Sequence, residues 1–215
     1  MHNLVIIPAR RNSIRLKNKN LLKIQNKTLV EHSINFAKKN IQFCNILVST
    51  DSKKIREISI KKKVLCPWIR PKKFSRSKSS TESVISHALK WYEKTVSIVD
   101  FIILLQPTTP FRTKKTFNRC LDSAKKNPLS TIITFKKNKK IFFKIKKKKL
   151  VLKKENFIEP TGSIYIISSN KFKKFNNIYS GRVTPILTSN EIENIDIDYK
   201  QDYIKAKKHL RGYNK

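Results

Sequence analysis

The sequence predicts an α/β fold: a Rossmann-like, mainly parallel sheet with helices on both faces and a small β-hairpin or arm. Apolar runs of strand length alternate along the chain with segments of helical periodicity, an order typical of βαβ units. The length of 215 residues suffices for one domain with a full hydrophobic core. No internal repeat and no Gly/Ser-rich linker divides the chain, so we expect a single domain over 1–215.

The expected strands are apolar runs bounded by polar or turn-forming residues. They lie at 3–8, 45–49, 100–105, 130–135 and 162–168. Between them, apolar residues at helical spacing predict helices around 29–37 and around 55–59, the second capped by Asp51. The clearest helix begins at 79–82, where Ser-Ser-Thr-Glu has the pattern of a capping box, and continues as far as Tyr92.

Residues 136–160 depart from this alternation. Phe142 and Phe143 are separated from the apolar run 150–152, and lysines flank both. Short apolar runs of this kind favour extended strands over a core helix. We therefore expect a lysine-rich hairpin or arm within the domain.

The chain is strongly basic, with 49 Lys and Arg against 14 Asp and Glu and a formal net charge of +35. A charge of this size is typical of nucleic-acid-binding proteins. It is also what A/T-rich coding produces, because Lys, Asn, Ile and Phe abound while the chain has 3 Gly. Both interpretations stay open from the sequence. In either case the field attracts anionic ligands.

The cysteines and the N-terminus bear on the compartment. The cysteines are Cys44, Cys66 and Cys120. Their odd number and wide spacing predict reduced thiols rather than a disulfide framework or a zinc site. The N-terminal apolar run covers 4–7 and is followed at once by Arg10 and Arg11, which fits neither a signal peptide nor a membrane span. We expect a cytoplasmic protein with no membrane partner.

The strand predicted at 3–8 leads into a loop crowded with cations, and such strand ends are common phosphate sites in α/β proteins. Over 6–20 the chain reads Ile-Pro-Ala-Arg, then a Ser three residues after the Arg, then Lys-Asn. Further motifs follow in order at 48–51, 70–80, 104–112, 161–166 and 195–198. In these motifs and their order, the chain resembles the acylneuraminate cytidylyltransferases, which activate sialic and related nonulosonic acids with CTP.

The resemblance implies transfer of CMP from CTP to a nonulosonic acid, with release of pyrophosphate. It assigns nucleotide binding to Arg10, Ser13, Lys19, Asn20, Arg70 and Ser80. Arg10 and Lys19 are also expected to be catalytic. A planar guanidinium and a compact ammonium can neutralise the phosphates while a sugar hydroxyl attacks the α-phosphorus.

Asp196 and Asp198 form the candidate metal site. If 194–197 is extended, the strand period of two places both carboxylates on one face. Carboxylates together with substrate phosphates suit Mg²⁺. The resemblance assigns the metal to this Asp-Ile-Asp, with Asp198 also catalytic. The alternative is a pair of surface acids, with Asp198 capping a helix from Tyr199.

Gln106 should emerge at the carboxyl edge of the sheet, where α/β proteins bind ligands. The resemblance assigns sugar binding to Gln106 and Tyr165. Each residue also has a structural alternative: Gln106 could satisfy the backbone of the turn, and Tyr165 could fill the core.

The loop departs from the family pattern. Arg11 and Asn12 stand where the family has a Gly pair, and Ile14 stands where it has a lysine. Asn tolerates a left-handed backbone better than most residues, whereas Arg11 would be strained in that conformation. Arg15 and Lys17 are the candidates to supply the charge that Ile14 lacks.

Two further functional hypotheses follow. One is nucleic-acid binding on the same fold, led by the basic arm. The other is a family member with weak turnover because of the altered loop. The family precedent favours a homodimer, and the sequence does not distinguish N-acetylneuraminate, legionaminate and pseudaminate as the acceptor.

Overall fold

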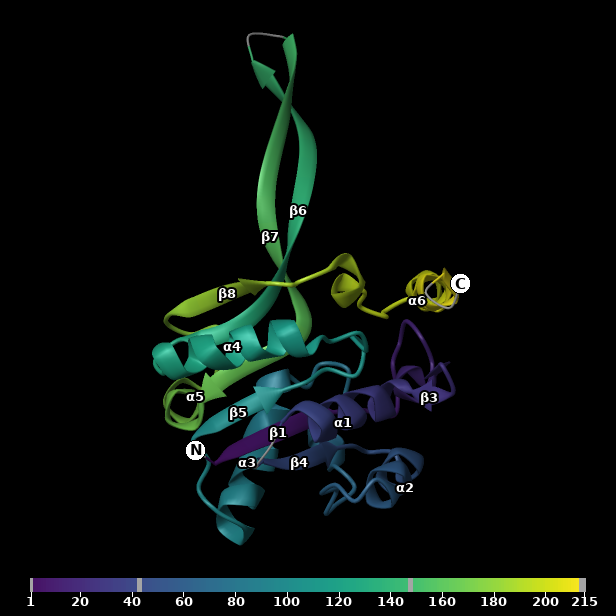
Figure 1. Ribbon diagram of the computed structural model, residues 1–215, viewed down its shortest axis with the longest axis vertical. Coiled ribbons are helices and arrows are strands. Elements are labelled where there is room, and N and C mark those ends of the chain that lie inside the picture. The colour runs from purple at the N-terminus through teal and green to yellow at the C-terminus, as the bar shows by residue number, and fades with distance from the viewer. Residues whose placement is uncertain (1, 42–43, 147–148, 213–215) are drawn as a thin grey trace.

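The computed structural model describes residues 2–41, 44–146 and 149–212. Its centre is a six-stranded sheet in the order β4-β1-β5-β7-β6-β8 (Figure 1). The strands are β1 (Asn3–Pro8), β4 (Cys44–Ser49), β5 (Phe101–Leu104), β6 (Thr131–Lys146), β7 (Lys149–Ser168) and β8 (Val183–Leu187). β7 runs antiparallel to β5 and to β6, and the other neighbours are parallel. The predicted mainly parallel sheet is confirmed.

Helices cover both faces of the sheet, also as predicted. They are α1 (Leu29–Asn40), α2 (Lys53–Lys61), α3 (Thr81–Thr95), α4 (Lys114–Lys126), α5 (Ser169–Phe175) and α6 (Lys200–Gly212). Short elements complete the fold: the ribbon β2 (Lys23–Ile24) and β3 (Lys27–Thr28), and the 3₁₀ turns η1 (Lys19–Leu21), η2 (Lys72–Phe74) and η3 (Glu191–Asn194). No helix within the described ranges is long and apolar enough to cross a membrane.

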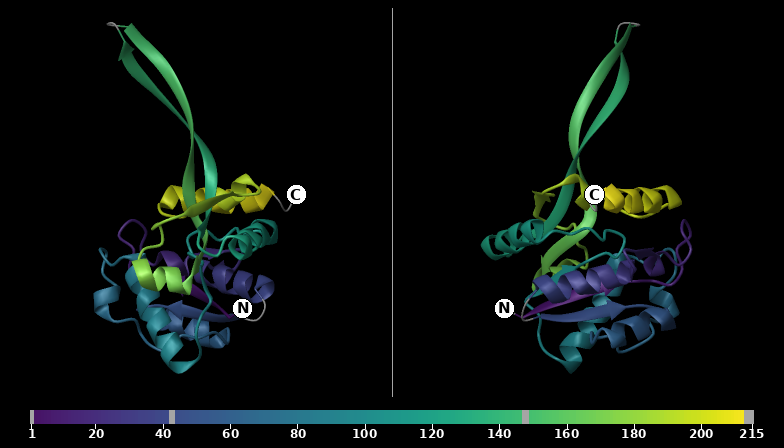
Figure 2. Two further views of the ribbon diagram at one scale, coloured as in Figure 1. Left: turned by 90° about the vertical axis from the view of Figure 1, so that its left-hand side faces the viewer. Right: turned by 45° about the vertical axis from the view of Figure 1, so that its right-hand side comes forward.

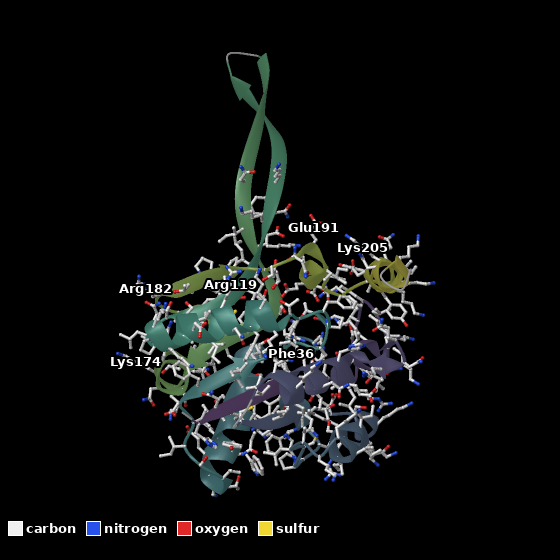
Figure 3. The ribbon with its side chains drawn as sticks, in the orientation of Figure 1. Phe36, Arg119, Lys174, Arg182, Glu191 and Lys205 are labelled. Carbon is white, nitrogen blue, oxygen red and sulfur yellow. The ribbon has the colours of Figure 1, made fainter. Side chains whose placement is uncertain are left out.

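Alternation along β1 creates two hydrophobic cores. Val5 and Ile7 pack with apolar side chains of α1, α2 and α4, while Leu4 and Ile6 pack on the opposite face with α3 and α5. On the first face, Phe36 of α1, labelled in Figure 3, lies on the side of the sheet that α4 covers. Its ring contacts that of Phe117 of α4 edge to face, with ring centroids 5.8 Å apart. Because both faces are covered, β1 has to be apolar throughout its middle.

The three cysteines are free, as expected: Cys66 and Cys120 are buried and Cys44 is half-buried. Burial raises the pKa of the Cys44 and Cys66 thiols to about 11. These side chains therefore contribute packing and no thiolate chemistry.

Ser or Thr side chains cap the N-termini of α1 to α5, with differences from the predicted caps. Ser52, and not Asp51, caps α2. Ser80 caps α3, one residue later than the capping-box pattern indicated. A complete capping box is found instead at α1, where Thr28 and Glu31 satisfy each other's backbone N–H groups.

The hairpin predicted from the lysine-rich segment is confirmed. β6 and β7 pair in antiparallel register through Lys136↔Glu159 and on to Lys146↔Lys149. Their outer parts leave the body of the protein and project away from it in each view (Figures 1 and 2). The arm is thus a continuation of two core strands. Residues 147–148, between the two strands, lie outside the described residues.

Candidate active site

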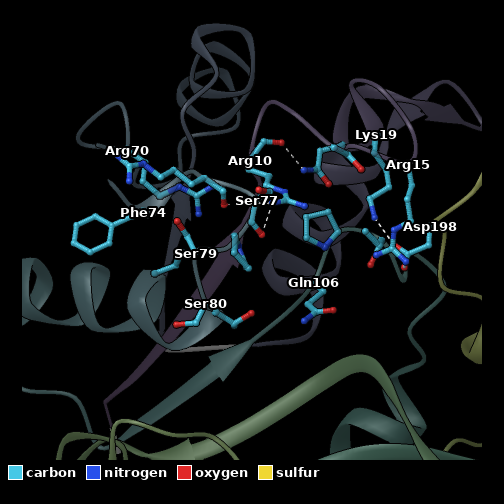
Figure 4. A pocket seen from close by; sticks show the side chains of 18 of the residues that line it. Arg10, Arg15, Lys19, Arg70, Phe74, Ser77, Ser79, Ser80, Gln106 and Asp198 are labelled. Carbon is cyan, nitrogen blue, oxygen red and sulfur yellow. Dashed lines mark hydrogen bonds and ion pairs between the residues drawn. The ribbon is translucent and has the colours of Figure 1, made fainter. Parts of the chain in front are cut away.

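A cavity of about 350 Å³ opens at the carboxyl ends of β1 and β5, beside the first turn of α3 (Figure 4). This is the edge at which α/β sheets bind ligands. Of the side chains predicted from the sequence, those that line it are Arg10, Ser13, Lys19, Asn20, Arg70, Ser80, Gln106, Asp196 and Asp198. The motifs, though far apart in the chain, meet here.

Arg10 follows β1 directly and keeps its guanidinium available. Its Nη1 lies 3.5 Å from the carbonyl oxygens of Arg76 and Ser77, at the outer limit of hydrogen bonding. Asn20 is buried and donates from Nδ2 to the carbonyl oxygen of Arg10 at 2.9 Å. Asn20 therefore fixes the backbone from which Arg10 extends, and Arg10 can turn to an anion in the cavity.

The residues that replace the family's Gly pair cause no left-handed strain. Among the described residues of this loop, a positive φ occurs at Asn18 (52°) and not at Arg11 or Asn12. Both Arg11 and Asn12 are exposed, and Arg11 donates its backbone N–H to Oδ1 of Asp51 at 2.6 Å. The strain considered for Arg11 is not found.

Asp198 is held by two cations of the same loop. Lys19 Nζ donates to Oδ1 at 2.6 Å, and Arg15 Nη1 lies 2.8 Å from Oδ2 (Figure 4). The N–H groups of Asp198 and Tyr199 donate to the carboxylate of Asp202 in the first turn of α6, while the Asp198 carboxylate itself contacts the two loop cations. The Asp198 side chain is thereby left to the cavity.

Asp196 lines the same cavity from a segment with no regular secondary structure. Its side chain stays accessible to water, yet partial desolvation by the surrounding protein raises the pKa of its carboxyl. The charges of Asp198 and Asp202 raise this pKa further, while Thr108 and Lys19 act in the opposite direction. Asp196 and Asp198 thus differ in electrostatic setting although both face one cavity.

The two carboxylates offer oxygen donors to a divalent cation. Over the described part of the chain, no three or more His, Cys, Asp or Glu side chains gather into a metal site of their own. Mg²⁺ needs no such site, because it binds through a few carboxylates, substrate phosphates and retained waters. The donor set of Asp196 and Asp198 fits a Mg²⁺ that is held jointly with a phosphate ligand.

Arg70 is anchored by Asp51, which follows β4, and by Ser75 of its own segment. It is 4% exposed, its Nη2 lies 3.9 Å from Oδ1 of Asp51, and its Nε donates to Ser75 at 3.3 Å. Burial lowers the pKa of Arg70 and the charge of Asp51 opposes this. Asp51, for which the sequence suggested only a helix cap, therefore joins Arg11 to Arg70. Ser80 caps α3 at the cavity, which turns the positive end of that helix toward a ligand.

Gln106 lies against Gly162 of β7. Gly162 has a φ of 72°, and a Cβ at this position would be 2.7 Å from Oε1 of Gln106. The positive φ favours glycine at this position, and any larger residue would displace the Gln106 amide from its present place. The turn uses the backbone carbonyl of Gln106, which accepts from Thr109 and Arg112, so the side-chain amide is left to the cavity.

Arg112 is a site-building residue that sequence reasoning missed. It is buried and donates to the carbonyl oxygen of Ser163 at 2.8 Å and to Oγ of Ser33 at 3.1 Å, in addition to the Gln106 carbonyl. Burial lowers the pKa of Arg112. By joining α1, β7 and the turn after β5, it positions Gln106. Its place at the end of the 104–112 motif was the available signal.

Tyr165 is the predicted site residue that is not brought to the cavity. It is 4% exposed and packs in the core with side chains of α3 and α5, and its hydroxyl lies 3.4 Å from that of Tyr179. The geometry favours the alternative of a core side chain.

The family described as Cytidylyltransferase matches residues 4–213. The chain belongs to the cytidylyltransferase family. It is 27% identical over 226 residues to a CMP-N,N'-diacetyllegionaminic acid synthase of Legionella pneumophila, covering 97% of this chain and 96% of that protein. It is 32% identical over 114 residues to a pseudaminic acid cytidylyltransferase of Campylobacter jejuni, covering 53% of this chain and 49% of that protein. The resemblance drawn from the motifs is confirmed, and this cytidylyltransferase is a nucleotidyltransferase enzyme.

Solved structures show the same fold. A CMP:2-keto-3-deoxy-manno-octonic acid synthetase complexed with CTP superposes with a TM-score of 0.72 at 14% identity, covering 99% of this chain and 100% of that one. A 4-diphosphocytidyl-2C-methyl-D-erythritol synthase from Anaerococcus prevotii superposes with a TM-score of 0.66. At such identities the likeness establishes the architecture of this cytidylyltransferase.

Proposed function

We propose that this cytidylyltransferase transfers CMP from CTP to a nonulosonic acid and releases pyrophosphate. The observation that carries the proposal is the meeting of Arg10, Lys19, Gln106, Asp196 and Asp198 in one cavity. The relatives described above are named for legionaminic and pseudaminic acid, both of them nonulosonic acids. Nucleotide-loop cations, an amide donor for a sugar and paired carboxylates are the parts that this reaction needs.

The triphosphate of CTP would lie along the loop after β1. Arg10 offers a planar fork to two phosphate oxygens, and Lys19 offers a compact charge. Arg70 and the N-terminus of α3 at Ser80 would face the cytidine end, in keeping with the family pattern. Ser13 and Asn20 would shape the phosphate loop between them.

In the reaction, a hydroxyl oxygen of the sugar bonds to the α-phosphorus while the bond from that phosphorus to the bridging oxygen breaks. The β- and γ-phosphates leave as pyrophosphate, and the hydroxyl proton passes to a base, a role open to the cavity carboxylates. Asp196 and Asp198 would hold Mg²⁺ from the protein side. When bound, the metal would neutralise charge on the phosphates.

The acceptor sugar would be held by the Gln106 amide, which Gly162 and Arg112 position. Legionaminate is the first acceptor to test, because a relative matched over 97% of this chain is named as a CMP-diacetyllegionaminic acid synthase. Pseudaminate and N-acetylneuraminate belong to the same chemical class and form the remaining panel.

We also propose a homodimer that engages the arm. A two-stranded ribbon is marginally stable by itself in water, and the outer part of β6 and β7 extends away from the body (Figure 2). Pairing with a second copy would cover it. Analytical ultracentrifugation of the full chain tests this, and a monomer at micromolar concentration would contradict it.

The test of function is pyrophosphate release from CTP and Mg²⁺ with each of the three acids, alongside a salt-dependent titration with RNA. We expect release that depends on one of the acids, and RNA binding that disappears at moderate salt. Salt-resistant RNA binding without any release would favour the nucleic-acid-binding alternative. CTP binding with no release from any acid would identify the weakly active family member.

A further inference from the structure

The cavity carries more positive than negative side chains. Among the described residues that line it, the cations are Arg10, Arg15, Lys19, Arg70 and Arg76, and the carboxylates are Asp196 and Asp198. Five cations against two carboxylates leave an excess of three positive charges. Such a site is electrostatically matched to a polyphosphate. The family pattern leaves Arg15 without a role in this set.

The family has a lysine where this chain has Ile14, and Arg15 and Lys17 are the two residues that could replace its positive charge. The structure distinguishes between them. Ile14 is 81% exposed and is not among the residues that line the cavity. Lys17 is exposed and likewise does not line it. Arg15 lines the cavity and reaches Asp198. The cation that faces the ligand space is therefore Arg15.

The Arg15 guanidinium has two contacts, an ion pair with Asp198 and a cation–π contact with Tyr199, and neither holds it tightly. Its Nη1 lies 2.8 Å from Asp198, and its guanidinium carbon lies 5.2 Å from the centroid of the Tyr199 ring. The Arg15 side chain is 50% exposed, and an ion pair this exposed contributes little to stability. The guanidinium can therefore leave Asp198 at small cost, while stacking on Tyr199 restricts the directions that it samples.

We propose that Arg15 is a further phosphate-binding residue of this site. In the nucleotide-free protein it pairs with Asp198, and when CTP binds its side chain moves so that the guanidinium contacts the β- or γ-phosphate instead. The proposal rests on CTP being the substrate. A guanidinium binds two phosphate oxygens at once, which is a stronger arrangement than its exposed pair with Asp198. The exchange also frees Oδ2 of Asp198, while Lys19 keeps its contact with Oδ1.

The experiment is calorimetric titration of the full chain in EDTA, with CTP and with CMP as separate probes. Arg15→Gln is compared with Lys17→Gln, which removes the same charge two residues away from an exposed side chain outside the cavity. We expect Arg15→Gln to weaken CTP binding about ten-fold or more and CMP binding by less than about two-fold. Lys17→Gln should leave both affinities within about two-fold. Arg15→Lys should recover part of the loss, because it restores charge but not the planar fork.

Tyr199→Leu gives a second, independent readout. It leaves both charges of the pair in place and removes the ring beneath the guanidinium, so CTP binding should weaken by less than in Arg15→Gln. Equal CTP affinity in Arg15→Gln and Lys17→Gln overturns the proposal, as does an equal loss of CTP and CMP binding in Arg15→Gln. If the unsubstituted chain binds no CTP, the proposed function itself fails, which is a separate outcome.

Discussion

Asp196 and Asp198 are two residues apart, yet their electrostatic surroundings differ. Asp198 is paired with Arg15 and Lys19, whereas desolvation and neighbouring carboxylates raise the pKa of Asp196 in the folded chain. A carboxyl with a raised folded-state pKa binds protons more tightly folded than unfolded. Its ionised form therefore lowers the free energy of unfolding at neutral pH. A charge that costs stability at this position is what a ligand-binding role of Asp196 would require.

Asp196→Asn should raise the thermal unfolding midpoint at pH 7, because it removes this unfavourable charge. The gain should shrink as pH falls through the raised pKa of Asp196 toward its ordinary value of 3.8, since the wild-type carboxyl is then protonated in both states. Scanning calorimetry in EDTA measures it. Asp122→Asn, an exposed acid on α4, is the control and should show no such pH dependence. A lower midpoint for Asp196→Asn at pH 7 would contradict the electrostatic argument.

Asp198→Asn keeps size and one oxygen but removes charge from the candidate metal pair. We expect Mg²⁺ activation to shift to higher metal concentration and turnover to fall by about two orders of magnitude or more. Pyrophosphate release over a Mg²⁺ titration is the measurement, with Asp196→Asn run in parallel. An unchanged Mg²⁺ profile in both variants would leave the two carboxylates without a metal role.

Gly162→Ala should impair use of the acceptor sugar. The new Cβ would lie 2.7 Å from Oε1 of Gln106, so the amide must move. We expect KM for the acceptor to rise about ten-fold, with CTP affinity unchanged. Gly181→Ala is a matched control, because Gly181 also has a positive φ (67°). A Cβ added at Gly181 would lie 3.7 Å from the nearest atom, Cε of Lys171, which is an ordinary contact. Both variants should lose about 1–2 kcal/mol of stability from the backbone, and only Gly162→Ala should change the acceptor KM. The same KM change in both variants would sink the positioning role.

Among the helices and strands, the sequence predicted best those with a clear pattern of buried residues. β1 is buried on both sides and reads as an apolar run, so its bounds match the predicted 3–8. α4 and β8 were not predicted. α4 buries a narrow stripe that includes Phe117 and Cys120 among lysines, and β8 is a half-buried edge strand with Pro185 inside it. A proline is tolerated there because an edge strand need not donate on its open side.

The arm should be dispensable for nucleotide binding. It extends away from the body, and none of its outer residues lines the cavity within the part that the structure describes (Figure 1). Replacing lysines 146–149 by serine should leave CTP affinity within about three-fold at moderate salt, since screening beyond about 10 Å weakens distant charges. Calorimetry with CTP tests this. A collapse of CTP binding would place the arm in the active site.

For the molecule as a whole, motifs in the sequence predicted which residues form the site, because loops at one sheet edge must meet. The motifs could not predict which side chains of the site contact one another. Lys19 and Asp198 pair across 179 positions, and Arg112 reaches Ser33 across 79, contacts that depend on the finished packing. For Tyr165 the motif left a cavity role and a core role open, and strand alternation places it in the core, on the face covered by α3.

The electrostatic attraction of CTP should come from the positive charges of the cavity rather than from the net charge of +35 on the chain as a whole. Raising ionic strength from about 0.05 to 0.5 M shortens the screening length several-fold, so kcat/KM for CTP should fall steeply while kcat changes little. The variant with serine in place of lysines 146–149 is the control, because it removes positive charge from the arm and leaves the cavity unchanged. If the field that matters comes from the cavity, with its five cations against two carboxylates, this variant should show nearly the same salt slope as the parent. Arg15→Gln should show a shallower one, because it removes a cavity charge. Steady-state kinetics over a salt series measures all three slopes. A slope that flattens with the arm lysines and not with Arg15 would show that the surface charge, rather than the site, attracts the nucleotide.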